Sequence, residues 1–148
     1  MKEAVGGLGI TQIVIFFLIL FSAYIAISIN MNRAEKVKNE VISIIQKNNG
    51  FDSRALAQIQ DYMSSVGYRS TGKCEGDWKG YGSASSMSSK SLFCIKEKEL
   101  EMDGSTEFPK SAYYQVKVFF ALDLPIFNDM FKLQLTGSTR RLYYPNTM

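Results

Sequence analysis

The stretch IVIFFLILF, residues 13–21, decides how the rest of this chain is interpreted. It lies in the middle of residues 4–32, which contain no charged side chain. In a helix that rises 1.5 Å per residue, these residues would extend over about 43 Å. The hydrocarbon core of a bilayer is about 30 Å thick and requires about 20 apolar residues. The sequence therefore predicts an N-terminal segment and transmembrane helix over residues 1–32, followed by one domain over residues 33–148.

The apolar segment is longer than that of a secretory signal peptide, whose apolar core has about 7–15 residues before a small-residue cleavage site. Ala23 and Ala26 are small, but further apolar sequence, residues 27–29, follows them. We therefore expect an anchor that is retained in the cell membrane, in contact with lipid.

The charges on the two sides of the span allow two orientations. Lys2 and Glu3 precede the span, and Arg33, Lys36 and Lys38 follow it. The positive-inside rule alone would place the C-terminal side in the cytoplasm. Long domains, however, translocate regardless of charge, and a cysteine pair favours an oxidising compartment. We expect a single-pass protein with its N-terminus in the cytoplasm and its domain outside it.

The composition argues against most enzyme classes. The chain of 148 residues has a net charge of +3, with acidic and basic residues interspersed, which gives no indication of nucleic-acid binding. The absence of histidine excludes Ser-His-Asp and Cys-His systems and histidine-ligated metals within this chain. The acidic residues 97–107 lack the order of a calcium loop. The sequence predicts no catalytic residue, no metal site and no cofactor.

The two cysteines, Cys74 and Cys94, flank a stretch rich in glycine and serine. A disulfide between them would staple this loop. The alternative is two unpaired buried thiols. We favour the disulfide.

The helical pattern continues beyond the span. No proline or glycine interrupts residues 10–49, and Gly50 is expected to take the left-handed conformation that ends the helix. Lys38 lies off the apolar stripe. The stripe recurs at spacings of three and four residues: Ala34, Val37, Val41, Ile44 and Ile45.

A second helix is expected after a cap at Asp52 or Ser53, ending at Gly67. Its apolar positions are Leu56, Ile59, Met63 and Val66.

The remaining sequence predicts an antiparallel sheet. Strand patterns cover residues 68–74, 91–98, 112–122 and 131–142. We expect a surface loop over residues 75–91, an acidic turn over 97–108, a break at Pro125 and a bulge or turn at Gly137. The predicted fold class is α+β, with the amphipathic half of the long helix packed on a small antiparallel sheet.

Three stretches give this chain a family resemblance. They are the membrane helix that runs into the polar residues 30–47, the strand and proline of VKVFFALDLP (residues 116–125), and the ending LTGSTRR (residues 135–141). In this order of elements the chain resembles type IV pilin-like proteins, and most closely the minor pseudopilins of the TadE/TadF-like group of tight-adherence systems. The resemblance implies a non-catalytic subunit of a surface pilus or secretion apparatus of the Tad, type II or type IV kind.

The resemblance also implies partners, and the chain departs from the family pattern at one point. The partners would be other pilin-like or secretion-apparatus subunits, or further copies of this chain, in some cases within a surface filament. Pilin-like proteins are cleaved after a small residue, with a glutamate five residues into the mature helix. Gly6, Gly7 and Gly9 are candidate neighbours of a cleavage site, but only Thr11 and Gln12 are polar at that depth. A minor, priming or anchored component fits this departure better than a major subunit.

Candidate contact residues lie in the span and in the glycine-rich loop. Gly6, Gly7 and Gly9 would permit close helix packing or form a lead-in to the span, and Gln12 and Ser22 could hydrogen-bond between helices. Other candidates are Trp78 and Tyr81, which would contact a partner or fold back onto the domain. The alternative function is a monomeric, membrane-tethered module that binds a ligand or surface outside the cytoplasm.

Overall fold

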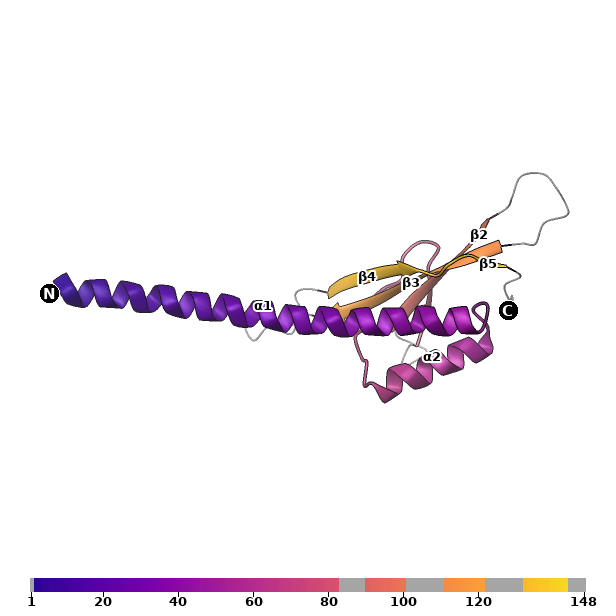
Figure 1. The fold of residues 1–148 in the computed structure, drawn as a ribbon, viewed down its shortest axis with the longest axis horizontal. Helices are drawn as coiled ribbons and strands as arrows, with labels where there is room; N and C mark the ends of the chain where they lie inside the picture. Colours follow the sequence, from indigo (N-terminus) through magenta and orange to yellow (C-terminus); the bar gives the residue numbers. More distant parts are fainter. Residues whose placement is uncertain (1, 83–89, 101–110, 122–131, 144–148) are drawn as a thin grey trace.

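A computed structural model describes residues 2–82, 90–100, 111–121 and 132–143 of the chain. Figure 1 shows one long helix whose N-terminal half projects away from the rest, while a sheet and a short helix lie along its C-terminal half. The elements, in chain order, are α1 (Lys2–Lys47), α2 (Ser53–Ser65), β1 (Lys79–Tyr81), β2 (Phe93–Leu100), β3 (Ser111–Ala121), β4 (Lys132–Ser138) and β5 (Leu142–Tyr143). The long apolar helix and the small antiparallel sheet agree with the α+β class expected from the sequence.

The helix α1 has 46 residues, which corresponds to a length of about 69 Å. It ends where the N–H of Asn49 donates to the carbonyl of Gln46 and the N–H of Gly50 donates to that of Ile45. Asn49, with φ 53°, takes the left-handed helical conformation, and Gly50 follows with φ 149°. The prediction that Gly50 would take this conformation was therefore one residue too late. Asparagine tolerates the left-handed region better than most residues do.

The second helix is capped at both ends. The Asp52 carboxylate accepts a hydrogen bond of 2.7 Å from the N–H of Ala55, which confirms Asp52 as the cap. At the other end Gly67 has φ 62°, and the N–H of Tyr68 donates to the carbonyl of Met63. The Arg33 guanidinium donates to the carbonyls of Val66 and Gly67, at 2.6 and 3.2 Å. This cation ties the C-terminal end of α2 to α1, where the helix dipole favours a positive charge.

The sheet is antiparallel in the order β1-β2-β3-β4, with β5 also paired to β3. The prediction of a strand over residues 68–74 was wrong, since only an isolated bridge joins Gly72 to Ser91 there. The strand β1 lies instead inside the predicted loop 75–91, because residues 79–81 pair with β2.

Two predictions overlap at residues 97 and 98, a strand that ends at residue 98 and an acidic turn that begins at residue 97. The structure continues β2 to Leu100, since Glu97 pairs with Tyr114 and Glu99 with Ala112, so the strand extends two residues further than predicted. The rest of the predicted turn, the break at Pro125 and residues 83–89 lie outside the described residues. The strand predicted over 131–142 is divided into β4 and β5.

The apolar stripe of α1 packs between the sheet and α2. Val37, Val41 and Ile45 are at most 2 % exposed, which confirms the predicted stripe. They share one core with side chains from the sheet and from α2, including Phe93, Val116, Val118, Ile59 and Met63. The core reaches back along α1 to Ile27, which packs against it.

Gly137 has a different role from the one predicted. It is neither a bulge nor a turn, because it lies within β4 and pairs with Val116. A Cβ atom at Gly137 would lie 2.8 Å from Cδ1 of Ile42 and 3.0 Å from Cδ of Lys38. Glycine therefore lets α1 approach β4 closely. The Lys38 side chain, only 15 % exposed, lies beside this contact and is not fully off the packed face.

Candidate functional site

The main candidate surface among the described residues is the apolar part of α1 that nothing in the domain covers. Large side chains of residues 10–21 remain about half exposed or more, from 48 % for Ile19 to 67 % for Ile10. By length and composition, the helix segment Gly9–Lys47 could cross a membrane. A continuous apolar surface of this kind marks a membrane or protein contact.

Helical periodicity divides this surface into two faces. At about 100° per residue, Gly7, Leu18 and Ser22 fall within about 60° of one another, and Ile25 and Ile29 continue the same face. The buried Val41 lies on the other side of α1. We call the five residues Gly7, Leu18, Ser22, Ile25 and Ile29 the outer face of α1, since it points away from the domain.

The candidate residues in the span are therefore not all brought together. Gly7 and Ser22 share the outer face, whereas Gly9 and Gln12 lie toward the side that the domain occupies further along α1. Gly6 belongs to α1, but its burial is not part of what the structure describes. A Cβ atom added at Gly7 or Gly9 would meet nothing within 4 Å beyond the adjacent backbone of α1, so a neighbouring helix can approach there.

Two hydroxyl groups of the span, those of Thr11 and Ser22, bond within their own helix. Thr11 donates to the carbonyl of Gly7 at 2.9 Å. Ser22 lies 2.9 Å from the carbonyls of both Leu18 and Ile19. Ser22 therefore has its donor satisfied inside α1, and only its acceptor capacity remains for a partner helix.

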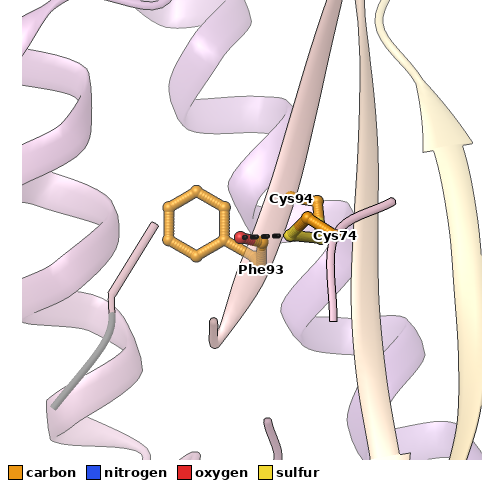
Figure 2. The surroundings of a disulfide bond; sticks show 3 residues. All are labelled: Cys74, Phe93 and Cys94. Carbon is orange, nitrogen blue, oxygen red and sulfur yellow. Dashed lines mark hydrogen bonds between the residues drawn. A yellow bond between two sulfur atoms is a disulfide. The ribbon is translucent and has the colours of Figure 1, made fainter. Parts of the chain in front are cut away.

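The cysteine pair lies where β2 meets the preceding segment (Figure 2). Cys74 and Cys94 are at disulfide distance, with Cα atoms 5.8 Å apart. Cys94 is fully buried, on the sheet face opposite to that of Phe93 and Ile95. The dashed line in Figure 2 marks a contact of 3.9 Å from Cys74 Sγ to the carbonyl of Phe93. A disulfide sulfur has no proton, so this contact is not a donated hydrogen bond.

Trp78 and Tyr81 lie in different surroundings. The Nζ atom of Lys117 lies over the Trp78 ring, 4.3 Å from its centroid. Beside it, Lys96 donates to Asp77 at 2.8 Å, and this hydrogen bond lowers the pKa of the Asp77 carboxyl. Trp78 is half-buried and rests on the sheet face that points away from α1.

Tyr81 instead faces the core. Its ring stacks on Phe93 at 5.7 Å and meets the edge of Phe51 at 4.8 Å. Burial raises the pKa of Tyr81. Sequence reasoning placed both aromatic residues in one exposed loop because β1 is too short to give a strand pattern. Both side chains are half-buried, and of the two only Tyr81 packs against the core.

Two polar groups of the domain hold the structure together and were not singled out from the sequence. The Tyr114 hydroxyl donates to Glu97 at 2.9 Å, and burial, together with this bond, raises the pKa of Tyr114. Arg33 joins α1 to α2 as described above. Its signal in the sequence is that it is the first charge after the span. Among the described residues, no group of three or more Cys, Asp or Glu side chains could hold a metal ion.

No family model, curated protein or solved structure matches this chain in comparisons with known proteins.

Proposed function

We propose that this chain is a non-catalytic, membrane-anchored subunit of a pilin-like assembly, such as a surface pilus or a secretion apparatus, in a minor or anchored position. The observation that carries the proposal is that one uninterrupted helix forms both parts of the molecule. The N-terminal half of α1 is apolar and uncovered, and its C-terminal half forms part of the domain core. The domain is therefore held rigidly relative to the span.

The outer face of α1 supports an assembly over a single tether. Ile25 and Ile29 are 42 % and 61 % exposed. At the same level Ile27 already packs against the domain. Lipid covers the part of this face that lies within the hydrocarbon core, but the apolar side chains at its end, next to Arg33, would meet headgroups or water in a solitary protein. A like helix alongside α1 would cover them, since small and apolar residues let membrane helices pack closely.

The mechanism would be mechanical. Each subunit would place its outer face against neighbouring helices, in the membrane or in a filament, while the sheet presents its surfaces outside. In this arrangement the domains surround a core of α1 helices.

Cross-linking in the membrane tests the proposal. The full chain would carry Leu18→Cys on the outer face, or Phe16→Cys at nearly the same depth on the opposite face, and would be oxidised in the membranes of its own host. We expect a cross-linked product for Leu18→Cys and little or none for Phe16→Cys, because only the outer face contacts a neighbour. Mass spectrometry would identify the product as a second copy or another single-span protein. If none of residues 13–21 gives a product as cysteine, the chain is a monomeric tether and the proposal is wrong.

A further inference from the structure

The sheet has two open edges among the described strands. The strand β1 pairs only with β2, and β4 pairs along its length only with β3. Unpaired strand edges present rows of N–H and C=O groups with which a strand of another chain can pair.

The edge formed by β4 has few of the features that usually prevent such pairing. Lys132, the first residue of β4, is charged, but residues 133–138 contain no charge and no proline, and β4 pairs with β3 at seven consecutive positions without a bulge. Gln134, Thr136 and Ser138 are exposed, and Leu133 is 41 % exposed. Natural proteins usually protect an edge of this length with charges, prolines or bulges. Beyond Lys132 the strand has none of the three, so its edge is open to pairing with another strand.

The direction of the strands identifies the partner. Each of β1, β2, β3 and β4 is antiparallel to its neighbour, so β1 and β4 run in opposite directions. Copies anchored in one membrane have parallel α1 helices and therefore sheets of the same orientation. The β1 edge of a neighbouring copy thus meets β4 in the antiparallel direction, which is the more stable pairing. Two β4 edges would have to pair in parallel, with their α1 helices on opposite faces of the joined sheet.

The register of the sheet also agrees with pairing between β4 and the β1 of a neighbouring copy. Lys79 pairs with Ile95, Ile95 with Val116 and Val116 with Gly137, so β1 lies level with residues 135–137 of β4. A neighbour at the same height in the membrane presents its β1 to these residues. Tyr81 and Leu135 both belong to the face that packs on α1, so the alternation of the two faces continues across the junction.

We propose that β4 of one copy pairs antiparallel with β1 of the next copy, with Lys79–Tyr81 opposite residues 135–137, so that the sheet continues from subunit to subunit. This inference rests on the proposed assembly function, because the copies have to share a membrane. The contact is head-to-tail, and it produces a ring or an open filament.

Spacing sets the curvature of this array. Four strands at about 4.8 Å place successive copies about 19 Å apart in a flat sheet, whereas packed helices lie about 8–10 Å apart. The joined sheet has to curve with α1 on its inner side for the outer faces to meet. A three-residue strand offers only about two or three backbone hydrogen bonds. The pairing therefore depends on the high effective concentration within the membrane.

Photo-cross-linking of the full chain in its membrane tests this pairing. A photoreactive amino acid would replace the exposed Lys79 in β1. Trypsin cleaves after Lys132 and Arg140, so β4 is recovered as the peptide of residues 133–140. We expect a dimer band in which residue 79 is joined to this peptide. Within one copy β2 and β3 separate β1 from β4, so such a product has to join two copies.

Two variants give the matched comparison. Thr136→Lys places a charge on the β4 edge, and we expect it to lower the cross-link yield at least about tenfold. Gln115→Lys makes the same charge on the same face of the central strand β3 and should leave the yield unchanged. Equal melting temperatures of the two variants would show that the loss does not come from unfolding.

Three results would overturn the pairing. They are a cross-link from residue 79 to β1 of the other copy, a yield unchanged by Thr136→Lys, and no dimer at residue 79 while Leu18→Cys still cross-links. The last result would leave the proposed function standing. If, in addition, none of residues 13–21 gives a product as cysteine, the proposed function fails with it.

Discussion

Val41 shows at the level of a single residue how the long helix is held on the sheet. It has no exposed surface and lies in the middle of the buried stripe of α1. Val41→Asp would place a carboxylate in this core without a partner. We expect it to lower the free energy of unfolding by about 3 kcal/mol or more, out of a total of about 5–15 kcal/mol. Denaturant unfolding of the purified chain, followed by Trp78 fluorescence, measures this change.

Asn39→Asp is the matched control, because Asn39 is exposed on the same helix and gains the same charge. It should change the unfolding free energy by no more than about 0.5 kcal/mol. Lys38 is unsuitable, since its side chain packs beside Gly137. Equal stabilities of the two aspartate variants would refute the helix-on-sheet packing.

Tyr68 makes the stability of the domain sensitive to alkaline pH. Burial raises its pKa from 10.0 to about 12, although Arg33 and a hydrogen bond to the carbonyl of Phe119 oppose this rise. Because the unfolded chain ionises first, stability is complete below pH 10 and is lost as the pH rises toward 12. The loss for this group is at most about 1.4 kcal/mol per pH unit.

Tyr68→Phe should therefore have two effects on unfolding curves measured between pH 8 and pH 12. At pH 8 the variant should be less stable by about 1 kcal/mol, because the Phe119 carbonyl loses its donor. Above pH 10 its stability should fall less steeply than that of the parent. Tyr114 and Tyr81, whose pKa values are also raised, would contribute to the remaining slope. Parallel plots of stability against pH for the parent and the variant would argue against the raised pKa of the buried Tyr68 hydroxyl.

At the level of elements, β2 and the residues just before it are joined at two points to the segment that precedes β1. Gly72 forms a bridge to Ser91, and Cys74 lies at disulfide distance from Cys94, 20 residues further along. The Cα separation of 5.8 Å is in the usual range of disulfides. The covalent link would hold in place a segment with little regular structure of its own.

We expect peptide mass spectrometry without reductant to find one linked pair, Cys74 with Cys94. In the chain-entropy model a loop of this size contributes about 3 kcal/mol. The double variant Cys74→Ala/Cys94→Ala should be less stable by about this amount, and reductant should lower the parent to the same level. Free alkylation of both thiols in protein purified without reductant would contradict the pairing.

At the level of the whole molecule, the topology follows from one span and one domain. We expect the domain to lie outside the cytoplasm, as the cysteine pair favours. Protease added to intact spheroplasts should then digest residues beyond Arg33 and leave a small membrane-protected fragment. A cytoplasmic protein digested only after lysis serves as the control. Protection of the domain in intact spheroplasts would show the opposite orientation.

The sequence alone determined the features that depend on neighbours along the chain. The uncharged span, the apolar stripe of α1, a cap at Asp52 or Ser53 and a strand over residues 112–122 all leave a local periodic or capping signal, because the period of a helix or strand and the reach of a cap depend on residues a few positions apart. The span and the stripe together also predicted the main part of the candidate site, which is the uncovered N-terminal half of α1 next to its covered C-terminal half.

Only the tertiary structure decided the features that depend on distant residues. The three-residue strand β1 exists because residues 79–81 meet β2, and this pairing brings Tyr81 into the core. Gly137 is needed because α1, almost 100 residues earlier, passes directly over it. The outer face of α1 could be recognised only once the domain was seen to lie on the other side. Contacts of this kind leave no periodic pattern, since the residues that make them are brought together by the fold and not by their spacing in the chain.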